Sequence, residues 1–249
     1  MAKTGSKKRK IIICIVSIVA VIALLFGACA VYLGDYYHAI TPAGESFGLQ
    51  DGSSLTETIK LDNGNIVCKS ENATKGLIFY PGGKVEYTAY LPLMESLAQK
   101  GILCVLVRMP FNLAVFDVNA ADGIREMFPE ITDWYIGGYS LGGSMAAAYL
   151  EKHPSDFKGL LLLAAYSTAD LSNENIRTLS IYGSNDGVLN REKYEQYRSN
   201  LPEFTEYIID GGCHAYFGVY GSQDGDGTPT IDNARQINLT ADAVEKWVG

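Results

Sequence analysis

The feature that most constrains the fold is a regular alternation of short apolar runs with amphipathic segments, which begins at Gly76. Runs that are apolar throughout indicate strands buried on both faces of a sheet. Such runs occupy residues 76–80, 102–107, 134–138 and 159–164, and further strands are expected at 178–182 and 204–209. Helical spacing is found at 90–100, 119–128, 140–153, 191–201 and 240–248. The order predicts an α/β fold with a mostly parallel, doubly wound sheet that has helices on both faces.

An antiparallel hairpin is expected ahead of this alternation. Two β-type runs, 58–61 and 65–68, flank Asp62-Asn63-Gly64. Asn-Gly between such runs is a strong signal for a tight hairpin turn. Later in the chain, only 13 residues separate Ala164 from Thr178. A connection this short predicts that no large cap domain is inserted there.

The N-terminal segment has a different character. Residues 11–33 contain no Asp, Glu, Lys or Arg, and as a helix they would be ~35 Å long, enough to cross a bilayer. The basic cluster at 7–10 predicts a cytoplasmic N-terminus, with the rest of the chain outside the cytoplasm. We therefore expect a single-pass protein of the cell membrane. A cleaved signal peptide is the alternative, because Ala28-Cys29-Ala30 fits a small-x-small cleavage site.

These patterns divide the chain into four expected parts, which are a basic cytoplasmic tail (1–10), a membrane anchor (11–33), a stalk (34–55) and one α/β domain (56–249). Such a domain is long enough to bury a substantial core.

The net charge is −8 for the whole chain and becomes −13 without residues 1–34, which hold five basic and no acidic residues. So acidic a surface disfavours nucleic acid as a partner.

The pentapeptide Gly138-Tyr139-Ser140-Leu141-Gly142 lies where a predicted strand meets a predicted helix. Small residues two before and two after a serine allow a very tight strand-to-helix turn that holds the serine in a strained conformation. The turn also directs the Leu141 N–H and the helix N-terminus toward a developing oxyanion. The pattern predicts that Ser140 is a nucleophile. The alternative is a Gly/Ser-rich turn without chemistry.

A nucleophilic serine needs a general base, and the chain has three histidines. His38 follows the apolar span, and His153 ends a predicted helix, where a cation suits the helix dipole. His214 follows the last predicted strand in the loop Gly211-Gly212-Cys213-His214. Its place after the serine matches the chain order of nucleophile and base in folds that hold a nucleophilic serine in a tight strand-to-helix turn. We therefore predict His214 as the base, with a surface loop residue as the alternative.

The acid is expected between the serine and the histidine. Asp186 follows the predicted strand 178–182, from which a carboxylate can orient an imidazole and stabilise its charged form. A simple Asn-Asp-Gly turn is the alternative, and Asp170 is the reserve candidate. For the oxyanion hole, the loop Pro81-Gly82-Gly83-Lys84 predicts an N–H donor from Gly83 or Lys84 in addition to Leu141. A plain strand-ending turn is the alternative there.

No metal site is expected from the residues. Asp224-Gly225-Asp226-Gly227 is weakly similar to a calcium loop, but it lacks the regular oxygen ligands and the closing glutamate. We interpret it as a turn at the rim of the site. Outside the apolar span, the cysteines Cys68, Cys104 and Cys213 are odd in number and lack metal-ligand spacing, which indicates free buried thiols or one disulfide.

From Gly76 to Val248 the chain resembles the α/β-hydrolase superfamily, specifically the "α/β-hydrolase fold-5" family near the dienelactone-hydrolase-like enzymes. The resemblance is carried by Tyr80-Pro81-Gly82-Gly83, Met109-Pro110-Phe111-Asn112-Leu113-Ala114, Gly138 to Gly143, Gly183 to Asp186, and His214 with Phe217-Gly218 and Tyr220-Gly221. It implies a Ser–His–Asp hydrolase of ester-like bonds without a cofactor. Relatives of dienelactone hydrolase often use cysteine as the nucleophile, so Ser140 argues against that particular substrate. Cys213 lacks an elbow and is interpreted as structural.

The expected activity is hydrolysis of small esters or lactones through an acyl-enzyme, as in a carboxylesterase or lactonase. Acyl transfer to an acceptor other than water is one alternative. A catalytically idle binding protein of the cell surface with the same fold is another, because a fold does not dictate a function.

Overall fold

The computed structural model describes residues 4–40 and 56–249, and the chain forms two compact units, Met1–Tyr36 and Tyr37–Gly249. The first unit is one helix, α1 (Thr4–Gly34). Within it, Ile12–Gly34 has a mean hydropathy of 3.0 and is long and apolar enough to cross a membrane. A signal sequence has the same properties, so the helix fits both interpretations of the N-terminus. Most of the predicted stalk, residues 41–55, lies outside the described residues.

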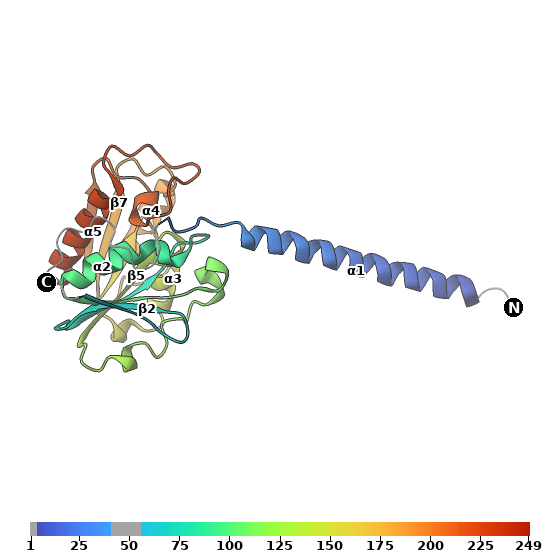
Figure 1. The fold of residues 1–249 in the computed structure, drawn as a ribbon, viewed down its shortest axis with the longest axis horizontal. Helices are drawn as coiled ribbons and strands as arrows, with labels where there is room; N and C mark the ends of the chain where they lie inside the picture. Colours follow the sequence, from blue (N-terminus) through green and yellow to red (C-terminus); the bar gives the residue numbers. More distant parts are fainter. Residues whose placement is uncertain (1–3, 41–55) are drawn as a thin grey trace. The chain divides into compact units, whose positions relative to one another are not determined.

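The second unit is built on one eight-stranded sheet with the order β1-β2-β4-β3-β5-β6-β7-β8 (Figure 1). Its strands are β1 (Thr56–Lys60), β2 (Ile66–Ser70), β3 (Lys75–Tyr80), β4 (Ile102–Leu106), β5 (Asp133–Tyr139), β6 (Gly159–Leu163), β7 (Arg177–Gly183) and β8 (Phe204–Ile209). Only β1 and β2 are antiparallel to their neighbours. The remaining pairs are parallel. The predicted α/β class and the N-terminal hairpin are confirmed.

Four helices cover the sheet, namely α2 (Leu91–Gln99), α3 (Leu141–Leu150), α4 (Arg191–Tyr197) and α5 (Asn233–Val248). Alternate side chains of each central strand enter different layers of the core. In β3, Leu77 and Phe79 pack with residues of α2 and α5, whereas Ile78 and Tyr80 pack with residues of α3. This arrangement explains why the central strands are apolar along most of their length.

The predicted helix at 119–128 is wrong. Only a 3₁₀ turn, Arg125–Met127, forms there. The Tyr80 hydroxyl donates to the Val118 carbonyl at 2.8 Å and accepts the Ala121 N–H at 3.0 Å, which draws these backbone groups away from helical pairing. Gly123 also has a φ of +75°, which a right-handed helix does not allow. A tertiary contact from β3 therefore overrides the local helical pattern.

Helix α5 begins at Asn233, seven residues before the predicted start at Thr240. The Asp232 side chain accepts the Arg235 N–H at 2.7 Å, which caps the helix at its true beginning.

The C-terminal ends of two helices also differ from the predicted ones, since α3 ends at Leu150 and α4 at Tyr197, each followed by a short 3₁₀ turn. His153 lies just after α3, and its Nδ1 is 3.0 Å from the Tyr149 carbonyl oxygen, in keeping with its interpretation as a helix-end residue.

Residues 37–40, which the sequence pattern assigns to the stalk, are hydrogen-bonded to the second unit. Tyr37 forms an isolated parallel bridge with Val85, just after the loop that follows β3. The Ile40 N–H donates to the Val219 carbonyl at 2.9 Å. These bonds make the lead-in segment part of the folded unit from Tyr37 onward.

Candidate active site

The carboxyl ends of the parallel strands bring distant parts of the chain to one edge of the sheet. Gly83 follows β3, Ser140 follows β5, Asp186 follows β7 and His214 follows β8. Strands that run in the same direction all end at the same edge, which is where α/β proteins place their ligands. The topology therefore gathers the predicted site residues before any side-chain contact is considered.

Ser140 lies in a sharp turn between β5 and α3, with φ 50° and ψ −122°. Its N–H donates to the Leu163 carbonyl of β6 at 2.9 Å, so the neighbouring strand holds the strained residue in place. A Cβ added at Gly138 would lie 2.5 Å from the Tyr80 carbonyl oxygen, and one at Gly142 would lie 2.2 Å from that of Pro81. Only glycine fits at these two positions, which explains the spacing of the pentapeptide.

The three side chains predicted as nucleophile, base and acid meet at this edge. The Ser140 Oγ lies 3.3 Å from the His214 Nε2, and the His214 Nδ1 lies 2.9 Å from the Asp186 Oδ2. The side chains of His214 and Asp186 are 1% and 0% exposed. The buried imidazole thus bridges a carboxylate and a serine hydroxyl, which is the geometry that proton transfer from the serine requires.

Asp186 is held by its own loop. Its Oδ1 accepts the N–H groups of Val188 at 2.9 Å and Leu189 at 2.8 Å, which leaves Oδ2 directed at the imidazole. The reserve candidate Asp170 is exposed, and its Oδ1 accepts the N–H and the hydroxyl of Ser172. These hydrogen bonds from Ser172 lower the pKa of Asp170, but they do not connect it to His214.

The loop after β3 lies directly against the start of α3. A Cβ added at Gly83 would be 2.7 Å from the Leu141 Cδ2. Leu141 is the first residue of α3, where N–H groups have no partner within the helix. The Lys84 N–H, in contrast, donates to the Asn112 carbonyl at 2.8 Å. Of the two predicted loop donors, Gly83 is therefore the better placed to act with Leu141.

A cavity of about 270 Å³ opens beside Ser140 and His214. Its remaining lining residues come from the start of α3 and from the loops after β6 and β7, and they are Leu141, Ser144, Ala164, Ala165, Tyr166, Val188, Leu189 and Asn190. Most of these side chains are small or apolar. Apart from His214, the lining contains no carboxylate and no basic side chain, so the cavity suits a small neutral group.

Aromatic residues that sequence reasoning did not assign to the site support the imidazole from behind. The Tyr139 ring lies 4.9 Å from the His214 ring, and its hydroxyl is 2.7 Å from that of Tyr220. The Tyr220 hydroxyl donates to Gln223. Burial raises the pKa of Tyr139 well above its ordinary value, so this phenol stays neutral. The residue before the nucleophile is thus a rigid packing partner of the base.

Within residues 4–40 and 56–249, no group of three or more His, Cys, Asp or Glu side chains is arranged to hold a metal ion. The thiols of Cys68 and Cys104 are free and buried on paired positions of β2 and β4. Burial, together with the negative charge of Asp226, raises the pKa of the Cys213 thiol to about 12. A neutral thiol is a poor nucleophile, which fits the structural role predicted for Cys213.

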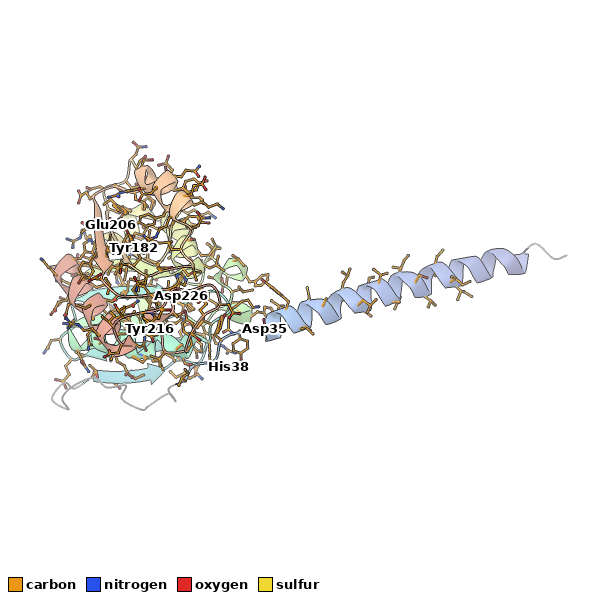
Figure 2. All side chains as sticks on the ribbon, turned by 90° about the horizontal axis from the view of Figure 1, so that it is seen from above. Asp35, His38, Tyr182, Glu206, Tyr216 and Asp226 are labelled. Atoms are coloured by element: carbon orange, nitrogen blue, oxygen red, sulfur yellow. The ribbon has the colours of Figure 1, made fainter. Side chains whose placement is uncertain are left out.

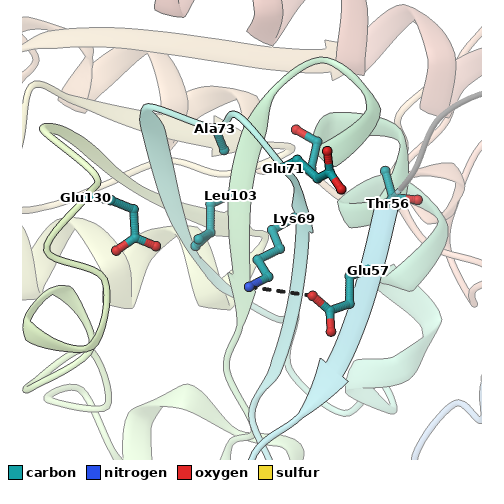
Figure 3. Close-up of a pocket in the computed structure, with 8 residues that line it drawn as sticks. Thr56, Glu57, Lys69, Glu71, Ala73, Leu103 and Glu130 are labelled. Carbon is teal, nitrogen blue, oxygen red and sulfur yellow. Dashed lines mark ion pairs between the residues drawn. The ribbon is translucent and has the colours of Figure 1, made fainter.

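A larger hollow of about 480 Å³ lies at the opposite edge of the sheet (Figure 3). It is formed around the start of β1, the end of β2 and the start of β4, and it contains the ion pair between Lys69 and Glu57, with an N–O distance of 3.5 Å. Glu71 and Glu130 also line it. Because these residues lie at the amino-terminal edge of the parallel strands, the hollow is remote from Ser140 and shares no residue with its cavity.

Comparisons with known proteins agree with this fold. The family model described as alpha/beta hydrolase family matches residues 76–238. A proline iminopeptidase from Thermoplasma volcanium is 24% identical over 152 residues, which cover 56% of this chain and 48% of the relative. The chain therefore spans about half the length of this curated relative.

Several solved structures share the fold. Carboxyl esterase 2 from the fungus Tuber melanosporum superposes with a TM-score of 0.57 at 12% identity, over 85% of this chain and 91% of the esterase. An esterase from Pyrobaculum calidifontis gives a TM-score of 0.56 at 14% identity, over 80% and 86% of the two chains. The family match extends over more than half of the sequence and includes Gly83, Ser140, Asp186 and His214. This protein accordingly belongs to the alpha/beta hydrolase family.

Proposed function

We propose that this protein is a serine esterase that hydrolyses small neutral esters or lactones. The observation that carries the proposal is the hydrogen-bonded line from Ser140 through His214 to Asp186, which lies beside a cavity of about 270 Å³ without a second charged group. Family membership supports hydrolysis in general, and the esterases among the structural neighbours share the fold.

The proposed reaction begins with attack of the Ser140 Oγ on the ester carbonyl carbon. His214 Nε2 takes the hydroxyl proton, and a tetrahedral intermediate forms. When the intermediate collapses, the ester C–O bond breaks and the imidazolium gives its proton to the departing alcohol. Water then attacks the acyl-enzyme with His214 again as the base, which releases the acid and restores the serine. Asp186 holds the Nδ1 proton and stabilises the imidazolium.

The negative charge of the tetrahedral intermediate needs donors that are fixed before the reaction. We assign this role to the backbone N–H groups of Gly83 and Leu141. The close approach of the Gly83 backbone to the Leu141 side chain supports this assignment. The N-terminus of α3 adds a favourable dipole at the same point.

The cavity favours an ester over a peptide with a free amino terminus. An aminopeptidase must bind a cationic ammonium next to the bond that it cleaves, and a carboxylate is the usual partner of such a group. Among the described residues, none that lines the cavity is a carboxylate, and the oxygens of Asp186 are engaged by His214, Val188 and Leu189. A short, uncharged acyl group is therefore the better fit.

The first prediction tests the nucleophile. Ser140→Ala should reduce hydrolysis of p-nitrophenyl acetate and butyrate to background, because a methyl group cannot attack the carbonyl. A fluorophosphonate probe should label the wild type and leave the variant unlabelled. Ser144→Ala is the matched control. Ser144 lines the same cavity, but its hydroxyl donates to the Tyr166 carbonyl at 2.6 Å, so its loss should leave labelling intact.

Three other results would change the assignment. Equal labelling of wild type and Ser140→Ala would place the nucleophile elsewhere. Absence of labelling and turnover in the wild type would favour the binding protein without catalysis. Formation of a new ester or amide in the presence of an added alcohol or amine, at the expense of free acid, would favour acyl transfer to an acceptor other than water.

We further propose that α1 anchors the protein in the cell membrane, with the basic segment 7–10 in the cytoplasm and the hydrolase unit outside it. The support comes from the length and hydropathy of Ile12–Gly34 and from the basic residues that precede it.

A further inference from the structure

Asp226 is labelled among the side chains of the second unit in Figure 2. Its Oδ1 accepts the N–H groups of His214 at 3.0 Å and Gly187 at 3.2 Å, and its Oδ2 accepts the Ala215 N–H at 2.8 Å. His214 is the proposed base, and Gly187 follows the proposed acid Asp186 directly in the chain. A single carboxylate therefore joins the backbone that carries the base to the backbone that carries the acid.

The segment around Asp226 is packed closely onto the acid loop. A Cβ added at Gly227 would lie 1.9 Å from the Asn185 carbonyl oxygen, and one at Gly187 would lie 2.5 Å from that of Gly225. The Asn185 amide also donates to the Thr228 carbonyl at 2.9 Å. Gly187 and Gly227 thus allow close packing of the two backbones, which places the Asp226 carboxylate between the two loops.

The carboxylate is negatively charged at neutral pH. Burial by itself would raise the pKa of Asp226, but hydrogen bonds from the N–H groups of Ala215, His214 and Gly187 lower it below its ordinary value. Hydrogen bonds to a charged acceptor are stronger than those between neutral groups. The three backbone contacts are for this reason firm restraints on both loops.

We propose that Asp226 is a positioning residue of the hydrolase site, which keeps the His214 imidazole in line between Ser140 and Asp186 by fixing the base loop to the acid loop. The inference rests on the esterase function proposed above. Asp226 does not touch the reacting atoms, because its oxygens bind main-chain N–H groups and not the imidazole ring. It acts through the backbone positions of His214 and Ala215.

This role predicts a specific kinetic signature. The Ser140–His214 contact of 3.3 Å leaves little room for displacement of the imidazole before proton transfer is impaired. A misplacement of about 1 Å at a reacting group can cost roughly 100-fold in rate. Apart from His214, the residues that line the cavity beside Ser140 make no hydrogen bond to Asp226. Loss of Asp226 should consequently lower kcat and leave KM almost unchanged.

The decisive variant is Asp226→Asn, which is nearly isosteric. Its NH₂ group cannot accept a hydrogen bond, so one of the two acceptor positions is lost. We expect kcat for p-nitrophenyl butyrate to fall by roughly 10-fold to 100-fold, as is typical for residues that support a reactive group from behind, with KM within about twofold of wild type. Asp226→Glu, which keeps the charge and both oxygens on a longer arm, should give an intermediate kcat and replaces Asp226→Asn if that variant does not fold.

Asp224→Asn is the matched control. It removes the same charge from the same segment, but the Asp224 side chain makes no hydrogen bond to any residue that the structure describes, and only its backbone N–H is engaged, with the Tyr37 hydroxyl. Its kcat and KM should remain within about twofold of the wild-type values, because the charge alone, at a surface position, is screened by solvent.

A second measurement does not depend on catalysis. Amide hydrogen exchange should become faster at His214 and Ala215 in Asp226→Asn, and should not change in Asp224→Asn. If Ser140→Ala retained activity, the proposed esterase function would be wrong. The hydrogen-exchange measurement would still test whether Asp226 restrains the backbone of His214 and Ala215. If kcat and the amide exchange rates of Asp226→Asn equalled those of the wild type, the inference would be overturned. Equal losses of kcat in Asp226→Asn and Asp224→Asn would also overturn it. So would a lower thermal midpoint of Asp226→Asn together with an unchanged kcat.

Discussion

Asp186 and Asp170 are alike in sequence, since each is an aspartate in a loop that follows a strand at the carboxyl edge of the sheet. The structure separates them by their hydrogen bonds. Asp186 contacts the imidazole of His214 at 2.9 Å, whereas Asp170 binds the backbone and hydroxyl of Ser172 at the surface. At the scale of the residue, Asp186 is distinguished from Asp170 because its second carboxylate oxygen, Oδ2, faces the His214 imidazole.

This difference yields a prediction at Asp186. In Asp186→Asn the amide would donate to Nδ1, so the neutral imidazole would carry its proton on Nε2 and could not accept the serine proton. We expect kcat to fall by roughly 10³-fold or more, as judged from the general effect of a wrong histidine tautomer. Asp170→Asn removes the same charge and should remain within about twofold of wild type. A similar loss in both variants, measured by steady-state kinetics, would show that the acid has been wrongly identified.

At the scale of the element, the boundaries of helices depend on contacts that a local pattern does not contain. The segment 119–128 has helical spacing, but Tyr80 of β3 binds the backbone at Val118 and Ala121, and only a short 3₁₀ turn remains. The turn between β5 and α3 shows the opposite case. There, the requirement for glycine at 138 and 142 is so strict that the sequence pattern predicts the geometry directly.

The cap of α5 gives a prediction at this scale. Asp232→Ala removes the acceptor of the Arg235 N–H and should destabilise the protein by about 1 kcal/mol. For a unit of this size, that corresponds to a thermal midpoint lower by roughly 2–4 °C. Asp232→Asn keeps a good capping side chain and should retain most of the stability. Because the cap is not part of the site, kcat should be unchanged in both variants, and equal thermal midpoints would show that the cap contributes nothing.

At the scale of the whole molecule, an acidic hydrolase unit is joined to an apolar helix that follows a basic segment. Charge keeps such a unit soluble, while the helix favours a bilayer. The two units thus differ in the solvent that each one prefers, which is the physical basis for proposing a membrane-anchored enzyme.

The anchor proposal predicts that the full chain sediments with membranes and is released by detergent but not by high salt or alkaline carbonate. Val19→Arg combined with Ile22→Arg should weaken insertion, because each charge near the centre of a span costs about 2.5–3.5 kcal/mol. Val19→Leu with Ile22→Leu is the matched control and should stay in the membrane. A mature protein that is soluble and lacks the N-terminal segment would instead identify that segment as a cleaved signal peptide.

The sequence alone determined the class of fold, because central strands buried on both faces must be apolar throughout and the helices between them must be amphipathic. It also marked Ser140, since the tight turn admits only small flanking residues. These are local constraints, and local constraints leave a readable pattern.

Only the tertiary structure decided which aspartate faces His214. It also decided that the Lys84 N–H is engaged by the Asn112 carbonyl, which leaves Gly83 as the loop donor. Finally, it showed that Asp226 joins the base loop to the acid loop. Each of these depends on a contact between segments that are distant in the chain. Such contacts are set by how strands and loops pack around one core, and a carboxylate or an amide in a loop carries no local sign of the partner that it will meet.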